Sequence, residues 1–213
     1  MKKAAFIDLD GTIFDSERVY QRFWKEAIAG AGFDPFFCDT LKLRSADRAL
    51  ATSYLRSIYG PGIDVDLVRK LRDEGMKEWL EENRYEVKPG VIQGLVYLRS
   101  KGIKPYIVTA TPKEKAVKTL SEYGLLSYFE DVISAKDVAH GKPAPDCYLK
   151  AIAEAKVTPE EGLAIEDAPN GIEAALAAGL DTYMVPDLSE PDETMKARLK
   201  GVLRNFNEIR RYL

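Results

Sequence analysis

The chain has 213 residues, of which 31 are Lys or Arg and 34 are Asp or Glu, so its formal net charge is −3; hydrophobic residues make up 46%. This balance is typical of an ordinary globular protein of one or two domains and excludes a disordered or fibrous chain. Because the charges nearly cancel, no broad basic surface is expected, which argues against a nucleic-acid partner.

The two cysteines, Cys38 and Cys147, lie far apart and outside any C-x-x-C pattern. They indicate neither a disulfide framework nor a zinc site, which fits a reducing compartment. Only four apolar residues precede Asp8, too few for the core of a signal peptide, and no apolar run approaches the length of a membrane span. We therefore expect a cytoplasmic protein with no membrane partner. We also expect a monomer.

The first 87 residues predict one strand followed by helices. The apolar run at 4–7 meets Asp8 and stops at Asp10-Gly11, as expected of a strand buried on both faces. Apolar residues then recur at helical spacing over 16–31, and helical periods continue over 45–58 and 64–83 without a convincing strand. We therefore predict an all-helical block at 16–87.

After residue 90 the pattern changes to alternating helices and strands. A helix at 91–100 precedes a strand at 106–108 that reaches Thr109, and Thr111-Pro112-Lys113-Glu114 predicts a capping box with Pro at the first helical position. The later elements are predicted from the same periodicities and turn residues. They are a weak strand at 132–133, a helix at 146–155, a strand at 163–165, a helix at 169–179 and a strand at 182–185.

Strands that alternate with helices predict an α/β fold with a doubly wound, mostly parallel, Rossmann-like sheet. The strand at 4–7 must join this sheet, because a lone strand would leave its backbone unpaired. Residues 1–15 and 88–213 are then the core domain, and 16–87 form an all-helical cap inserted into it. The hinges of such a cap are expected near 14–17 and 86–90.

Four polar positions follow the predicted strands: Asp8 with Asp10, Thr109, Lys142, and Glu166 with Asp167. Open parallel sheets bind ligands at the carboxyl ends of their strands, so these side chains are expected to converge. Four carboxyl groups gathered together repel one another, which favours a hard divalent cation with oxygen ligands, and Mg²⁺ is the natural choice.

A carboxylate nucleophile, Mg²⁺, a fixed Lys and a hydroxyl donor together suit phosphoryl transfer. Asp8 can attack phosphorus, while Asp10 can protonate the leaving alcohol and later activate water. Thr109 and the amide of Ala110 can hold phosphate oxygens, and Lys142 can neutralise charge. Taken singly, each position also has a purely structural explanation, such as an ordinary Asp-Gly turn or a solvated Lys.

The motifs 6–12 (FIDLDGT), Thr109, 141–146 (GKPAPD) and 165–172 (IEDAPNGI) occur in an order that resembles the haloacid dehalogenase superfamily over essentially the whole chain. The branch that it resembles most holds β-phosphoglucomutases and sugar-phosphate phosphatases. The resemblance implies that Mg²⁺ is bound by the Asp8 carboxylate, the backbone carbonyl of Asp10 and Asp167, with Glu166 contributing directly or through water. It also implies a substrate-specificity loop in the cap, which here contains Arg44, Ser45 and Arg48.

Within this superfamily, dehalogenases generally lack the second aspartate, so Asp10 argues against dehalogenation. A β-phosphoglucomutase usually carries a His where this chain has Tyr20, and its Gly-containing cap loop is replaced here by 43–46 (LRSA). The sequence therefore predicts a Mg²⁺-dependent phosphomonoesterase that acts on a small metabolite, with a sugar phosphate as the first candidate. A phosphosugar mutase and a non-catalytic phospho-ligand-binding module remain as alternatives. His140, Tyr20 and Trp24 are assigned structural or packing roles.

Overall fold

The structure is a computed structural model that describes residues 1–44, 46 and 48–213. Within these residues, six strands form one sheet in the order β3-β2-β1-β4-β5-β6, and every pairing between them is parallel. The strands are β1 (Ala4–Ile7), β2 (Lys104–Thr109), β3 (Val132–Ser134), β4 (Gly162–Glu166), β5 (Asp181–Met184) and β6 (Gly201–Val202). The predicted doubly wound α/β fold is confirmed.

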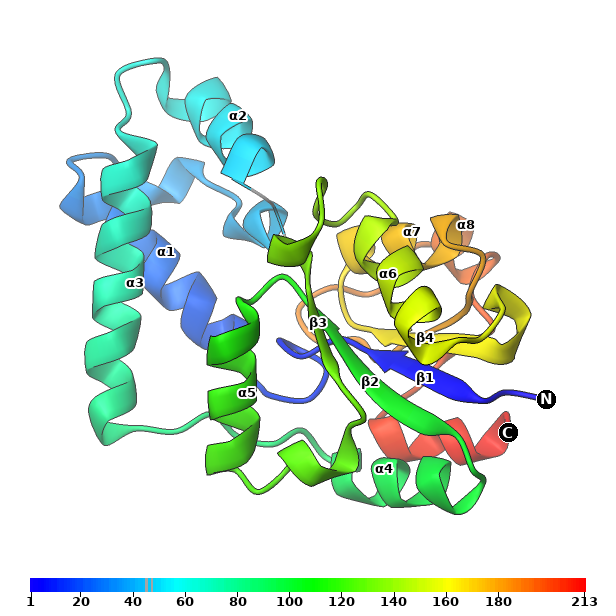
Figure 1. Ribbon diagram of the computed structural model, residues 1–213. Helices are drawn as coiled ribbons and strands as arrows, with labels where there is room; N and C mark the ends of the chain where they lie inside the picture. The colour runs from blue at the N-terminus through cyan, green and yellow to red at the C-terminus, as the bar shows by residue number, and fades with distance from the viewer. Residues whose placement is uncertain (45, 47) are drawn as a thin grey trace.

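Helices cover both faces of this sheet (Figure 1). They are α4 (Val91–Ser100), α5 (Lys113–Glu122), α6 (Asp146–Ala155), α7 (Pro169–Ala177) and the short α8 (Glu193–Lys196). All four residues of β1 are buried, since Ala4 and Phe6 belong to the same apolar cluster as residues of α6 and α7, whereas Ala5 and Ile7 belong to the cluster of α4 and α5. A strand buried on both faces places its carboxyl end inside the molecule, where Asp8 follows it.

Of the described residues between β1 and α4, those in three α-helices lie away from the sheet, on the left in Figure 1. They are α1 (Glu17–Gly30), α2 (Arg48–Tyr59) and α3 (Val65–Glu82). They share an apolar cluster of their own, which includes Trp24, Ile28, Leu55 and Val68. This arrangement is what a helical cap requires, and the domain bounds 16–87 stay a prediction.

The two connections between these helices and the sheet lie side by side. The amide of Asp15 donates to the carbonyl of Glu86 at 2.8 Å, and the amide of Lys88 donates to the carbonyl of Ile13 at 2.9 Å. The chain therefore leaves and re-enters the sheet layer at one place.

Two details differ from the predicted elements. The sequence pattern did not predict β6 or α8, because a two-residue strand and a four-residue helix have no detectable period. The capping box at Thr111 was wrong: α5 begins at Lys113, Pro112 occupies its N-cap position, and no side chain caps it. Thr111 lies one residue before the N-cap position, and its hydroxyl donates to the Asp10 carboxylate at 2.7 Å.

Among the described residues, no helix combines the length and apolar character needed to cross a bilayer.

Candidate active site

The buried charges of the described residues gather at one place. Six charged residues are buried, namely Asp8, Glu17, Arg44, Lys142, Glu166 and Asp167, and all of them lie at the carboxyl edge of the sheet or face it from the cap. Buried charges are costly unless they are paired or bind a ligand. Because the four acids outnumber the two bases, this arrangement favours a positively charged ligand.

Lys142 lies between two of the acids. Its Nζ is 2.6 Å from Asp8 Oδ1 and 2.6 Å from Glu166 Oε1, and it also donates to the carbonyl of Val108 at 2.9 Å. Burial opposes the charge on Lys142, but the two carboxylates outweigh burial and hold the pKa of Lys142 above its ordinary value. Lys142 is therefore a fixed cation at neutral pH.

Asp8, Glu166 and Asp167 bring one carboxylate oxygen each to within 4.8 Å of one another. Burial raises the pKa of Asp8 well above its ordinary value, and the neighbouring Glu166 and Asp167 raise it further against the opposing effect of Lys142. Burial likewise raises the pKa of Asp167, with Glu17 and Glu166 adding to the effect. Burial is the main cause of both shifts, and repulsion between the neighbouring carboxylates adds to it.

Two oxygens of this cluster have no hydrogen-bond partner, although both are buried: Asp8 Oδ2 and Glu166 Oε2. On the other side of Glu166, Oε1 accepts from both Lys142 and the hydroxyl of Tyr148. Buried oxygens without a hydrogen-bond partner are rare in native proteins, and their presence here indicates a binding site for a ligand. The hard oxygen donors of Asp8, Glu166 and Asp167 fit Mg²⁺.

The carboxylate of Asp10 does not join this cluster. Its Oδ1 accepts from the Ser16 hydroxyl at 2.7 Å and its Oδ2 from the Thr111 hydroxyl at 2.7 Å. Ser16 precedes the first cap helix and Thr111 precedes α5, so Asp10 is held between the cap connection and the core. The structure therefore brings three of the four expected carboxyl groups together, and the carboxylate of Asp10 lies outside that cluster.

Gly11 makes room for the cluster. Its φ is +84°, a conformation that favours glycine, and a Cβ at this position would lie 2.3 Å from Asp167 Oδ2. Any other residue would collide with the Asp167 carboxylate. The turn after β1 thus requires glycine for both backbone and steric reasons.

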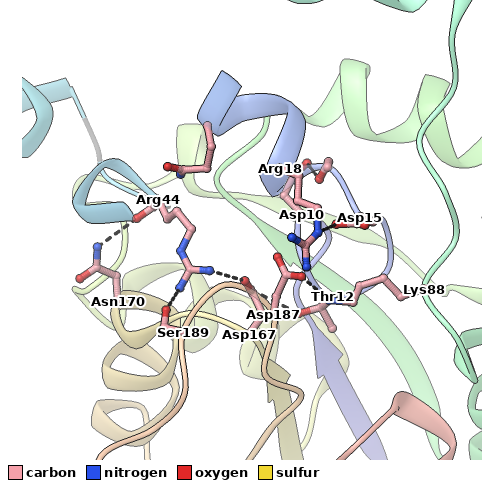
Figure 2. Close-up of polar contacts among 12 residues, drawn as sticks. Asp10, Thr12, Asp15, Arg18, Arg44, Lys88, Asp167, Asn170, Asp187 and Ser189 are labelled. Atoms are coloured by element: carbon pink, nitrogen blue, oxygen red, sulfur yellow. Dashed lines mark hydrogen bonds and ion pairs between the residues drawn. The ribbon is translucent and has the colours of Figure 1, made fainter. Parts of the chain in front are cut away.

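Arg44 reaches from the cap into the core (Figure 2). Its Nη1 lies 3.5 Å from Asp167 Oδ2, its Nη2 donates to the Ser189 hydroxyl, and its own carbonyl accepts from Asn170 Nδ2 at 3.1 Å. The side chains of Arg44 and Asp167 are 2% and 1% exposed, so this pair is shielded from solvent. The cap loop is thereby fixed to the segments that follow β4 and β5.

A cavity of about 390 Å³ opens onto these groups, a size that suits a small metabolite. Of the predicted residues, Asp8, Asp10, Thr109, Ala110 and Arg44 all line it. Thr109 is buried, and its hydroxyl accepts from the amide of Thr111 at 3.0 Å.

Sequence reasoning missed Glu17, which also lines the cavity. Burial raises the pKa of Glu17 well above its ordinary value, and Asp10 raises it further. The sequence feature that could have pointed to Glu17 is its position as an acidic residue in the first turn of the first cap helix. Whether that residue faces the sheet depends on how the cap sits, and helical periodicity does not fix this.

The other candidate residues lie elsewhere or contribute by packing. Ser45 lies outside the described residues. Arg48 Nη2 pairs with Asp66 at 2.6 Å on the surface and borders a neighbouring hollow that also reaches Ala110 and Lys142. Its predicted role in substrate binding stays a prediction.

His140 is exposed, with its Nδ1 3.0 Å from Asp146 Oδ1, and does not line the cavity. Trp24 packs in the cap core and also borders the cavity, as does the half-buried Tyr20. The packing role assigned to both aromatic residues therefore describes only part of their surroundings.

Known proteins resemble this chain along most of its length. A phosphorylated carbohydrates phosphatase of Thermotoga maritima is 27% identical over 84% of this chain and 82% of its own length. A crystal structure of a CbbY variant from Rhodobacter sphaeroides, in complex with xylulose-1,5-bisphosphate, is 25% identical with a TM-score of 0.81 and covers 98% of this chain and 96% of its own. A crystal structure of a putative β-phosphoglucomutase from Thermotoga maritima is 26% identical with a TM-score of 0.71, covering 100% and 98% of the two chains.

The family model of haloacid dehalogenase-like hydrolases matches residues 2–179, which include β1 through α7 and every buried charge described above. The chain belongs to the haloacid dehalogenase-like hydrolase family.

Proposed function

We propose that this protein is a Mg²⁺-dependent phosphatase that hydrolyses a small phosphorylated carbohydrate through a phosphoryl group carried on Asp8. The observation that carries the proposal is the position of Asp8. Its carboxylate is held by Lys142 in the same cavity as Asp10, and one of its oxygens has no protein partner. The phosphatase of phosphorylated carbohydrates named above supports the substrate class.

In the first step, the Asp8 carboxylate forms a bond to phosphorus and the ester bond to the substrate alcohol breaks. Asp10 gives its proton to the leaving alkoxide. Asp10 is suited to this step because the hydroxyls of Ser16 and Thr111 fix its two oxygens. In the second step, Asp10 takes a proton from water, the water oxygen bonds to phosphorus, and the bond to Asp8 breaks to release inorganic phosphate.

The remaining residues are proposed to offset the negative charge of the phosphoryl group and of Asp8. Asp8, Glu166 and Asp167, with the backbone carbonyl of Asp10, would hold Mg²⁺, which supplies positive charge near the phosphoryl oxygens. Lys142 offsets the charge of Asp8 during the transfer. Thr109 and the amide of Ala110 border the cavity where phosphoryl oxygens must lie, and they are the proposed donors to those oxygens.

The test is Asp8→Asn, which keeps the shape of the side chain but removes the nucleophile. Phosphate release from carbohydrate monophosphates in the presence of Mg²⁺ should fall by about a thousandfold or more. Acid-quenched wild-type enzyme should carry a phosphoryl group on Asp8, which mass spectrometry of the peptide containing residue 8 would detect. Undiminished release by the variant, or release that is independent of Mg²⁺, contradicts the proposal.

A phosphosugar mutase is the second candidate, favoured by the similarity to a putative β-phosphoglucomutase. Burial raises the pKa of Tyr20 well above its ordinary value, so its phenol cannot exchange protons near neutral pH as a histidine there would. Hydrolysis is therefore the first choice. Phosphorus NMR of a hexose 1-phosphate reaction would distinguish the two, because a mutase yields the 6-phosphate and a phosphatase yields inorganic phosphate.

A further inference from the structure

The cap wall of the active-site cavity carries positive charge that the proposed chemistry does not use. Arg69 and Arg72 lie three residues apart on α3, and both line the same cavity as Asp8 and Asp10. Residues three apart on a helix are neighbours on one face, and like charges there repel each other. Lys115, from α5 of the core, lines this cavity as well.

Arg72 is held in place before any ligand arrives. Its guanidinium carbon lies 4.4 Å from the centroid of the Trp24 ring, and its Nη2 pairs with Asp73 at 2.6 Å. The side chain is only 12% exposed. Its Nε also donates to Asp73 Oδ1, at 3.0 Å. Stacking on an indole ring and pairing with Asp73 orient the guanidinium, so that Nη1 is the nitrogen it can offer to an anion without giving up Asp73.

Arg69 and Lys115, in contrast, form no salt bridge with the residues that the structure describes, although Asp73 and Asp66 attract Arg69 from a greater distance. Arg69 is half-buried, and burial, followed by the repulsion from Arg72, lowers the pKa of Arg69. A partly desolvated cation beside a second cation is unfavourable until an anion joins them. Asp73 lines the cavity as well, but the three cations outnumber it, so this wall has surplus positive charge.

The ring of Tyr20 lies close to one cation from the cap and one from the core. The Arg72 guanidinium carbon lies 5.9 Å from the centroid of the Tyr20 ring, and Lys115 Nζ lies 6.0 Å from the same centroid. Arg72 comes from the cap and Lys115 from the core, so the two cations meet around one side chain. Together with Arg69 they offer donors from two directions.

We propose that Arg69, Arg72 and Lys115 form a second anion-binding subsite, and that the preferred substrate therefore carries a second anionic group apart from the phosphoryl group that is hydrolysed. The inference rests on the proposed phosphatase function and narrows its substrate class. The second group is a phosphate or a carboxylate, since both match the fork of an arginine. A sugar bisphosphate or a phosphorylated sugar acid meets this requirement.

The experiment uses two matched pairs of substrates with the full-length enzyme and Mg²⁺. Fructose 1-phosphate and fructose 1,6-bisphosphate differ by a phosphate, and glucitol 6-phosphate and 6-phosphogluconate differ by a carboxylate. The wild-type enzyme should show a kcat/KM at least tenfold higher for the second member of one or both pairs. The pair that shows the preference identifies the second group.

Arg69→Gln should reduce that preference at least fivefold, mainly through KM of the doubly anionic substrate. The matched control is Lys70→Gln, since Lys70 lies on the same helix but is exposed and outside the cavity. This control should leave the preference unchanged. Equal kcat/KM within both pairs for the wild-type enzyme, or an equal loss on both members in Arg69→Gln, would overturn the subsite.

Calorimetry separates this inference from the proposed function. The Asp8→Asn protein is titrated with the same four compounds in the presence of Mg²⁺, so that binding is measured without turnover. Tighter binding of the doubly anionic compounds, lost when Arg69→Gln is added, supports the subsite even if no compound is hydrolysed by the wild-type enzyme. Failure of hydrolysis with all four would count against the proposed function alone, whereas equal binding of all four refutes the subsite.

Discussion

Replacing Gly171 with alanine tests whether Glu166 is held in one position by its surroundings. Gly171 lies in α7, where alanine is normally about 1 kcal/mol more favourable than glycine. Here, however, a Cβ would lie 2.2 Å from the carboxylate carbon of Glu166 and from both of its oxygens. The carboxylate would have to move by about 1 Å or more to restore ordinary contact distances.

A carboxylate at the end of a flexible side chain can often move at little cost, but Glu166 is fully buried and held by Lys142 Nζ at 2.6 Å and by the Tyr148 hydroxyl. Hydrogen bonds to charged groups contribute about 1.5–3 kcal/mol each. Weakening both of them outweighs the helical gain, so we expect a net loss of about 2–4 kcal/mol in the free energy of unfolding. The same displacement should weaken Mg²⁺ binding about tenfold or more.

Urea unfolding followed by circular dichroism measures the first effect, and calorimetric titration with Mg²⁺ measures the second. The matched control is Gly62→Ala, because a Cβ there meets nothing within 4 Å and the backbone is not in the left-handed region. That variant should be as stable as the wild type, or slightly more so. If Gly171→Ala matches the wild type in both stability and Mg²⁺ affinity, Glu166 is not confined as argued.

Three further predictions concern the same site. Tyr148→Phe keeps the ring, whose centroid lies 5.3 Å from Lys142 Nζ, but removes a hydroxyl that donates to Glu166. Urea unfolding should therefore show a free energy of unfolding lower by about 1–3 kcal/mol. An unchanged midpoint would show that this hydrogen bond contributes nothing to stability. Asp10→Asn should leave the far-ultraviolet circular dichroism spectrum unchanged. It should lower kcat for carbohydrate monophosphates by about a hundredfold or more, because the amide cannot transfer the proton. A kcat within twofold of the wild-type value would exclude Asp10 as the general acid. Removal of Mg²⁺ with EDTA should abolish phosphate release and also lower the melting temperature, since a cation that binds only the folded state stabilises it against the repulsion among Asp8, Glu166 and Asp167. A melting temperature that does not respond to Mg²⁺ would argue that these carboxylates hold no cation.

The sequence predicted the fold and the convergence of the acidic residues for one reason. Strands β1 and β4 are continuous apolar runs that end in acidic residues, and parallel neighbours bring their carboxyl ends to the same edge. Asp8, Glu166 and Asp167 therefore meet whatever the details of the loops. Lys142 was placed from its motif, and the structure adds that it contacts both Asp8 and Glu166.

The residues that the sequence did not reveal come from helices. Tyr148 faces Glu166 from α6, Glu17 faces the cavity from α1, and Arg69 and Arg72 face it from α3. Helical periodicity shows which residues share a face, but it does not show against which neighbour that face lies. Only the packing of the cap on the sheet decides this, and that packing depends on contacts between segments distant in the chain.

The structure also links the cap to the proposed proton donor. Asp10 accepts one hydrogen bond from Ser16, at the entrance to the cap, and one from Thr111, in the core. The two connections of the cap pair with each other close to Ser16. If the cap rotates together with Ser16, we expect the bond from Ser16 to Asp10 to lengthen or change direction. The orientation of Asp10 would then depend on the position of the cap, whereas Asp8 is held by Lys142 within the core.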